Sequence, residues 1–209
     1  MIRNLLFDLG GVIMDIERSR CVEAFRELGL ENADHMLGVA SQKGAFGQLE
    51  EGSIDACTFR AEIRAAIGRP VSDAAIDAAF TRFLIGIPRK RLEYLRSLRG
   101  RYGIYMLSNT NPIMWNGFIA EQFRQEGRDI NAYFDGIVTS FEAKCMKPDP
   151  RIFGYAASHL GIDPAETLFL DDAEVNCRAA VGLGWHSAHV KPGREFIDVL
   201  RELNLAGNE

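Results

Sequence analysis

Residues 4–12 read NLLFDLGGV, and this stretch decides the fold. The apolar run before Asp8 predicts a short buried strand, and the two glycines after it predict a sharp turn. Open α/β sheets bind their ligands at the carboxyl ends of their strands, which is where Asp8 would lie. Gly10 is equally informative, because a glycine at this position leaves no second carboxylate beside Asp8.

Four more segments, 104–107, 136–139, 167–170 and 187–190, read as buried strands, and helical patterns separate them. The clearest helix covers 150–160, where Asp149 is a suitable N-cap, Pro150 fits the first helical position and Gly161 ends the pattern. Strands that alternate with helices predict an α/β fold with a doubly wound, mostly parallel, Rossmann-like sheet.

The segment 16–88 is too long for an ordinary crossover between the first two strands. Helical periodicity over 20–28, 54–67 and 73–84, with Ser53 and Ser72 as caps, predicts an all-helical insertion. We therefore expect a core domain of residues 1–15 and 89–209, with a helical cap domain of residues 16–88 over the carboxyl edge of the sheet. The basic run 89–91 is expected to form a solvated face near the hinge.

The 209-residue chain is 47% hydrophobic and 25% charged, and it carries a net charge of −5. This length can bury a sizeable core. The negative charge argues against a nucleic-acid or anionic-membrane partner, and no apolar run approaches the length that spans a bilayer. The four scattered cysteines form no CxxC pair, so we expect free thiols and a cytoplasmic protein. The oligomeric state is left open.

Four polar clusters follow the predicted strands or the loop just beyond one. In a parallel sheet the carboxyl ends of the strands share one edge, so these clusters should converge on one crevice. Each cluster alone is typical of a turn, a helix cap or a solvated loop; the four together, in this order, predict one functional site. The clusters are Asp8, Ser108-Asn109, Lys147 and Asp171-Asp172.

Phosphoryl transfer is the chemistry that these residue types favour. A carboxylate such as Asp8 can attack phosphorus and form an aspartyl-phosphate, which divides hydrolysis into two easier steps. Asp8 and Asp172, with Asp171 beside them, repel one another unless a cation intervenes, and their oxygen atoms suit Mg²⁺. The Ser108 hydroxyl and the amide or backbone of Asn109 can donate hydrogen bonds to phosphate oxygens, and a lysine can balance the charge.

On these motifs the chain resembles the haloacid dehalogenase-like (HAD) hydrolase superfamily over nearly its whole length. The resemblance implies that Asp8 is the nucleophile and a magnesium ligand, and that Gly10 ligates the metal through its backbone carbonyl. It also implies a small helical cap over the site. The other roles that it implies are phosphate binding by Ser108 and Asn109, charge balance by Lys147, metal ligation by Asp172, support of the metal shell by Asp171, and support of the site by Asn176.

One departure from the family pattern concerns the proton donor. Most phosphatases of the superfamily carry a second aspartate where Gly10 stands, and general acid–base catalysis of this kind contributes about 10²–10⁴-fold. The pattern Asp8-Leu9-Gly10-x-Val12 is similar to a bacterial branch that includes glucose-1-phosphate phosphatases. The resemblance therefore implies a Mg²⁺-dependent phosphatase acting on a small phosphorylated metabolite, such as a sugar 1-phosphate, whose leaving group is good.

Two other carboxylates are candidates for contact with the substrate or its proton. Asp15 either supplies the missing acid from the cap hinge or caps the first cap helix. Glu50, within residues 47–52, either faces the substrate or belongs to a solvated loop.

Two other functions stay open. A 2-haloacid dehalogenase attacks carbon and needs no metal, so the Asp171-Asp172 pair argues against it. A non-catalytic phosphate-ligand-binding regulatory module would have kept the pocket and lost turnover.

Overall fold

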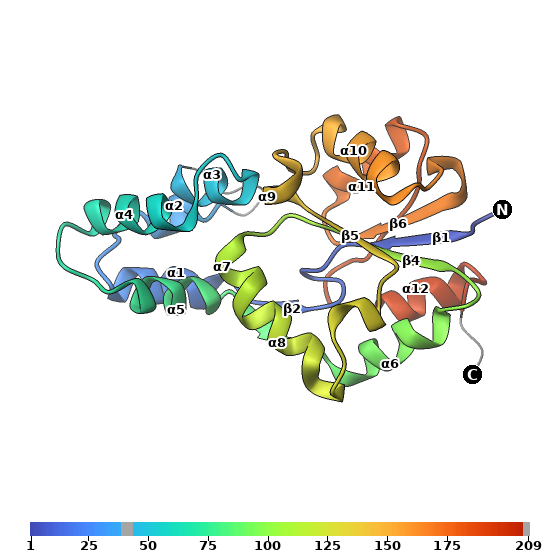
Figure 1. The fold of residues 1–209 in the computed structure, drawn as a ribbon, viewed down its shortest axis with the longest axis horizontal. Helices are drawn as coiled ribbons and strands as arrows, with labels where there is room; N and C mark the ends of the chain where they lie inside the picture. The colour runs from blue at the N-terminus through green and yellow to red at the C-terminus, as the bar shows by residue number, and fades with distance from the viewer. Residues whose placement is uncertain (39–43, 207–209) are drawn as a thin grey trace.

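The computed structural model describes residues 1–38 and 44–206. A five-stranded sheet lies at its centre, in the order β5-β4-β1-β6-β7, and every neighbouring pair is parallel (Figure 1). The predicted α/β fold is therefore confirmed, and the last strand begins one residue earlier than expected. The strands are β1 (Asn4–Phe7), β4 (Gly103–Ser108), β5 (Gly136–Thr139), β6 (Thr167–Asp171) and β7 (His186–His189).

Helices cover both faces of the sheet, which is why its central strands are continuously apolar. Side chains alternate across a strand, so Phe7 packs on Phe196 of α12 (Phe196–Glu202), with ring centroids 5.2 Å apart. Phe169 of β6 faces the other way and packs on Phe153 of α10 (Pro150–Leu160) at 5.5 Å. In Figure 1, α10 and α11 (Glu174–Gly182) cover one face, and α6 (Arg89–Leu98) and α12 the other.

The boundaries of α10 follow from its capping residues, as the sequence predicts. The Asp149 side chain accepts a hydrogen bond from the backbone N–H of Arg151 at 2.9 Å, and Pro150 is the first helical residue. Gly161 ends the helix in the left-handed conformation. These caps fix where the loop that carries Lys147 meets the helix.

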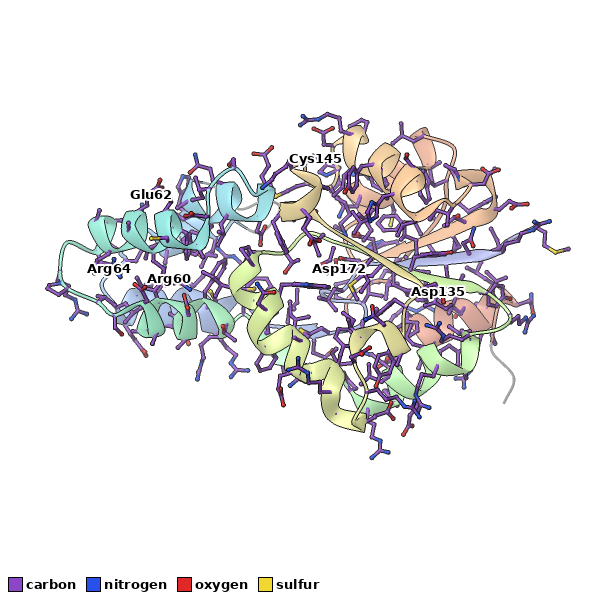
Figure 2. The ribbon with its side chains drawn as sticks, viewed as in Figure 1. Arg60, Glu62, Arg64, Asp135, Cys145 and Asp172 are labelled. Atoms are coloured by element: carbon purple, nitrogen blue, oxygen red, sulfur yellow. The ribbon has the colours of Figure 1, made fainter. Side chains whose placement is uncertain are left out.

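A second unit of helices projects from one side of the core (Figure 1), and we call α1–α5 the cap. Its interior contains four phenylalanines with ring centroids 5.0–6.0 Å apart, namely Phe25, Phe46, Phe59 and Phe80. Arg60 of α4 lies between α4 and α5 (Figure 2) and donates two hydrogen bonds of 2.8 Å to Asp77 of α5. The cap helices are α1 (Arg18–Glu27), α2 (Ala33–Met36), α3 (Ala45–Glu51), α4 (Ala56–Ile67) and α5 (Asp73–Thr81).

Two expectations for the insertion are wrong. It is not all helical, because β2 (Asp15–Ile16) and β3 (Leu84–Gly86) pair as a short antiparallel ribbon where cap and core meet. Ser72 caps α5, but Ser53 does not cap α4. Asp55 takes that place by accepting from the Thr58 N–H at 2.8 Å, and the Ser53 hydroxyl donates to the Gln48 carbonyl instead.

Short helical segments complete the core. They are α7 (Pro112–Met114), a π-helical turn (Trp115–Ile119), α8 (Ala120–Phe123), α9 (Ser140–Ala143) and three 3₁₀ turns (Arg124–Glu126, Ile130–Ala132 and Pro164–Glu166). Among the residues described, no helix combines the length and the apolar character that crossing a bilayer requires.

Candidate active site

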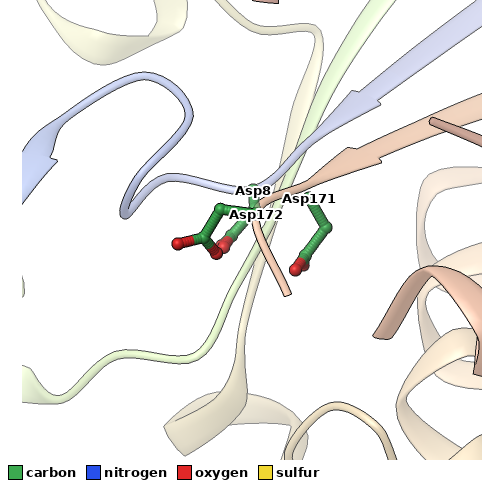
Figure 3. Close-up of side chains that lie close together, drawn as sticks. All are labelled: Asp8, Asp171 and Asp172. Atoms are coloured by element: carbon green, nitrogen blue, oxygen red, sulfur yellow. The ribbon is translucent and has the colours of Figure 1, made fainter. Parts of the chain in front are cut away.

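Three carboxylates meet at the carboxyl ends of β1 and β6 (Figure 3). The parallel register pairs Phe7 with Leu170, so Asp8 and Asp171 leave neighbouring strands side by side. Asp8, Asp171 and Asp172 each offer one oxygen atom, and these atoms all lie within 4.8 Å of one another. An all-oxygen donor set of this charge fits a hard divalent cation such as Mg²⁺.

Lys147 is the cation that this structure places among the carboxylates. Its Nζ atom donates to Asp8 Oδ1 at 2.8 Å, to Asp171 Oδ2 at 2.7 Å and to the Leu107 carbonyl at 3.0 Å. Burial opposes its charge, but Asp171 and Asp8 outweigh burial and raise the pKa of Lys147. The ammonium group therefore stays charged and fixes the direction of the Asp8 side chain.

One lysine does not balance three carboxylates. Burial, followed by the charges of Asp171 and Asp172, raises the pKa of Asp8 to about 7 even though Lys147 acts against the shift. Burial and Asp171 also raise the pKa of Asp172. The site is therefore short of positive charge, which a divalent cation at the cluster would supply.

Asp171 and Asp172 have different surroundings. Asp171 is fully buried, and its Oδ1 atom accepts from Asn176 Nδ2 at 3.0 Å and from the Ala173 N–H at 2.8 Å. With Lys147 on Oδ2, both oxygens of Asp171 have partners. Asp172 is half-buried. This geometry suits Asp171 to orienting Lys147, with Asn176 supporting it, and leaves Asp172 better placed to bind a metal.

The second glycine of the turn, Gly11, is required by its backbone conformation and by the neighbouring Asp172. Its φ angle is +71°, and a Cβ atom there would lie 2.1 Å from Asp172 Oδ2. Any side chain at this position would displace the Asp172 carboxylate. At Gly10, by contrast, a Cβ atom would only touch Ile16 at 3.5 Å, so the backbone does not require that glycine.

The Asn109 side chain holds the Lys147 loop. Its Nδ2 atom donates to the Lys147 carbonyl at 3.0 Å, and its Oδ1 atom accepts from the Lys147 N–H at 2.9 Å. The side-chain amide, one of the two phosphate donors expected at Asn109, is thus engaged elsewhere. The buried Ser108 hydroxyl makes a long hydrogen bond of 3.5 Å to the Asn109 carbonyl, and it and the Asn109 N–H are the donors of this pair that we expect to face phosphate.

A cavity of about 50 Å³ lies between cap and core, lined by Gly10, Ser108 and Asn109 of the core and by Glu50 of α3. Sites for small molecules usually measure about 300–1,000 Å³. The space holds one or two water molecules, so a substrate needs the cap to move away from this part of the core. The side chains of Asp8, Lys147 and Asp172 do not line this space.

The structure separates the two other candidate carboxylates. Glu50 is buried and lines the cavity. Asp15 instead accepts from Arg91 Nη1 at 2.7 Å, and it is not among the residues that line the cavity. The alternative that Asp15 caps the first cap helix is wrong, because Glu17 caps α1 by accepting from the Ser19 N–H.

Arg91 corrects the expectation of a solvated basic face at 89–91. Its side chain is buried, and it binds Asp15, the Ile13 carbonyl at 3.1 Å and Glu195 at 2.8 Å. Arg91 therefore ties the strand that leads into the cap to both α6 and the start of α12.

Ser140, at the start of α9, is a further residue of the site that its sequence context does not indicate. Its hydroxyl lies 2.6 Å from the Glu50 carbonyl and accepts from the Thr110 N–H at 3.0 Å. These partners lie 90 and 30 residues away along the chain, so no local pattern indicates the contact.

Comparisons with known proteins agree with this geometry. A family model of the haloacid dehalogenase-like hydrolases matches residues 2–184. The chain belongs to this family. A D-ribitol-5-phosphate phosphatase from Bacteroides thetaiotaomicron is 36% identical over 196 residues, which cover 94% of this chain and 95% of that protein.

Solved structures of the family show the same fold. A HAD family enzyme from Bacteroides thetaiotaomicron, in complex with magnesium and inorganic phosphate, is 40% identical with a TM-score of 0.90, and the match covers 96% of this chain and 100% of that one. A HAD-like family hydrolase from Porphyromonas gingivalis is 33% identical with a TM-score of 0.90, over 98% of both chains. The L-2-haloacid dehalogenase from Xanthobacter autotrophicus, at 21% identity and a TM-score of 0.62, shares the fold alone.

Proposed function

We propose that this HAD-family protein hydrolyses the phosphate monoester of a small polyol or sugar through an aspartyl-phosphate on Asp8. The observation that carries the proposal is the contact between the Asp8 carboxylate and Lys147 beside the Asp171-Asp172 pair. Together they offer a nucleophile, a fixed positive charge and oxygen ligands for a metal at one sheet edge.

The protein is a phosphatase of its family, and Mg²⁺ is its cofactor. We assign its ligands as Asp8, Asp172 and the Gly10 carbonyl, with Asp171 in the metal shell either directly or through water. When bound, the ion would supply the positive charge that offsets the negative charge of the carboxylates and of the phosphate.

The protein's own groups then have distinct tasks. Asp8 attacks phosphorus, and Lys147 holds the Asp8 side chain in place through its hydrogen bond to Oδ1. Ser108 and the Asn109 backbone bind the phosphate oxygens that do not react. The closed cap keeps bulk water away during the transfer.

The relative supports our proposal for the class of substrate. The phosphatase that is 36% identical is named for D-ribitol 5-phosphate, in which a primary alcohol is the leaving group. We therefore place phosphorylated polyols beside the sugar 1-phosphates that the missing second aspartate suggests.

The four cysteines are free thiols, and we propose a cytoplasmic location for the protein.

The test is phosphate release from D-ribitol 5-phosphate, glucose 1-phosphate and acetyl phosphate with Mg²⁺, by wild-type protein and by Asp8→Asn. We expect Asp8→Asn to lose turnover by more than about 10⁴-fold and to keep its fold, because an amide cannot replace the nucleophile. Circular dichroism checks the fold, and Asp77→Asn on the cap surface is the control. Full activity of Asp8→Asn would refute the nucleophile.

Other results of this experiment would favour other functions. Release of halide from a 2-haloacid in the presence of a chelator would identify a dehalogenase. No phosphate release from any substrate, together with binding of inorganic phosphate, would indicate a regulatory module.

A further inference from the structure

The proposed reaction needs a proton donor that the β1 turn does not contain. An alcohol leaves phosphorus as a basic alkoxide unless it receives a proton, and Gly10 stands where the superfamily pattern places a second aspartate. Asp15 is held by Arg91 at 2.7 Å, and Asp171 is held by Lys147 and Asn176. The donor must therefore come from another part of the chain or from water.

Glu50 of the cap reaches the same cavity as Gly10. It is 9% exposed, and it lines the space together with Gly10, Ser108 and Asn109. Among the residues that line this cavity in the described part of the chain, Glu50 is the only acid or base. The rest of the lining is largely apolar, as at Met14 and Phe83.

We propose that Glu50 is the general acid and base of the reaction, delivered from the cap in place of an aspartate at position 10. This inference rests on the proposed phosphatase function and adds to it the group that handles the proton.

Contacts with the core hold Glu50 in this position. The Ser140 hydroxyl lies 2.6 Å from the Glu50 carbonyl and accepts from the Thr110 N–H, two residues after Ser108. Lys144 Nζ donates to the Gly52 carbonyl at 2.6 Å. The end of α3 thus docks beside the phosphate-binding loop, and Glu50 is in place only while the cap is closed.

Gly52 allows this close docking. Its φ angle is +73°, and a Cβ atom there would lie 2.1 Å from the Phe141 carbonyl oxygen of α9. The backbone of the cap therefore approaches α9 more closely than any side chain at position 52 would permit.

The protonation state of Glu50 agrees with this role. Burial, followed by the negative charge of Asp8, raises the pKa of Glu50 to about 8. Burial, the larger of the two causes, favours the protonated carboxyl group, which is the form that a general acid needs before the reaction begins.

Glu50 transfers a proton in each of the two steps, formation of the aspartyl-phosphate and its hydrolysis. An Asp8 oxygen forms a bond to phosphorus while the bond from phosphorus to the alcohol oxygen breaks, and Glu50 gives its proton to that oxygen. The Glu50 carboxylate then takes a proton from water, whose oxygen forms a bond to phosphorus as the bond to Asp8 breaks. The products are the alcohol and inorganic phosphate, and both side chains return to their starting states.

Leaving groups of different basicity test this proposal. Acetyl phosphate releases acetate, which needs no proton, whereas D-ribitol 5-phosphate releases an alkoxide, which does. We would measure kcat/KM, which covers the steps up to release of the leaving group, for Glu50→Gln with Mg²⁺. Glu51→Gln is the matched control, because Glu51 is the next residue of α3 and is not among the cavity's lining residues.

We expect Glu50→Gln to lose about 10²-fold or more in kcat/KM on D-ribitol 5-phosphate and less than about threefold on acetyl phosphate. The variant should keep the wild-type affinity for inorganic phosphate, which shows that the site is folded. An equal loss on both substrates, or no loss on D-ribitol 5-phosphate, would overturn the role of Glu50. Wild-type protein that hydrolyses neither substrate would instead refute the proposed function itself.

Discussion

At the scale of single residues, the two adjacent glycines of the β1 turn serve different purposes. Gly11 has a positive φ angle and lies against the Asp172 carboxylate, so its missing side chain is a steric requirement of the proposed metal site. Gly10 has room for a Cβ atom. Of the two positions, only position 11 therefore requires glycine on steric grounds.

Gly11→Ala should weaken magnesium binding. A Cβ atom 2.1 Å from Asp172 Oδ2 forces this carboxylate out of the cluster, and we expect the Mg²⁺ affinity to fall at least about tenfold, the range seen when atoms that support a metal site are disturbed. Isothermal titration calorimetry with Mg²⁺ measures the change.

The control for this variant is Gly161→Ala. Gly161 has a similar φ angle of +66°, and nothing lies within 4 Å of the position that its Cβ atom would take. Both variants should lose about 1–2 kcal/mol of stability from the left-handed backbone. Only Gly11→Ala should lose metal affinity, and equal affinities would contradict the assignment of Asp172.

At the scale of elements, Arg91 connects the hinge of the cap to two helices of the core. Hydrogen bonds from Arg91 lower the pKa of Glu195 to about 2, against an ordinary value of 4.5. The folded state thus releases this proton more readily than the unfolded chain does. The resulting stability is present above about pH 4.5 and is lost as the pH falls towards 2.

Arg91→Met should therefore lower the free energy of unfolding at pH 7 by about 1–2 kcal/mol, allowing for the partial exposure of Glu195. Between pH 5 and pH 3 its stability should fall less steeply than that of the wild type, as urea unfolding would show. Arg89→Met is the control, because Arg89 is exposed and its ion pairs, with Glu93 at 3.0 Å and Glu126 at 3.8 Å, do not involve Glu195. The pair with Glu93 is worth about 0.3–0.5 kcal/mol. Parallel pH curves for Arg91→Met and the wild type would contradict the argument.

The elements that could be predicted from sequence carry their signal locally. The central strands are apolar runs that end in polar residues, and α10 is bounded by Asp149, Pro150 and Gly161. The β2–β3 ribbon has strands of two and three residues, which are too short to show a periodicity. The buried ion pairs of Arg91 could not be predicted, because their partners, Asp15 and Glu195, lie 76 and 104 residues away along the chain.

In the site, too, the residues that could be predicted are those whose position follows from the strands that carry them. Four clusters at strand ends predicted the convergence of Asp8, Lys147 and the Asp171-Asp172 pair, because parallel topology brings such ends together. Topology does not determine how a cap folds over the sheet. Glu50 and Asp15 are therefore both candidates from sequence, and two contacts separate them: the packing of α3 against α9 and the bond from Arg91 to Asp15.

At the scale of the whole molecule, magnesium should stabilise the fold, because the cluster of three carboxylates forms only when β1 and β6 are paired. At a concentration of 100 times Kd, a ligand adds about 2.7 kcal/mol. For a chain of this size that corresponds to a rise in Tm of about 5–10 °C. Thermal unfolding with Mg²⁺ and with a chelator measures the shift.

Asp172→Asn removes one of the charges that should hold the ion, and most of the shift should disappear with it. Asp135→Asn is a control of the same chemical kind at the edge of the core away from the cluster (Figure 2). If Asp172→Asn kept the full shift, the ion would be stabilising the protein from another place.

The docking of α3 on α9 also has a kinetic consequence. If substrate enters only those molecules whose cap is open, the apparent affinity of entry falls as the fraction that is open at rest becomes smaller. Each contact that favours closure, such as Lys144 with the Gly52 carbonyl, makes capture less frequent and the captured state longer-lived. The strength of this contact therefore determines the balance between how often substrate is captured and how long it is retained after capture.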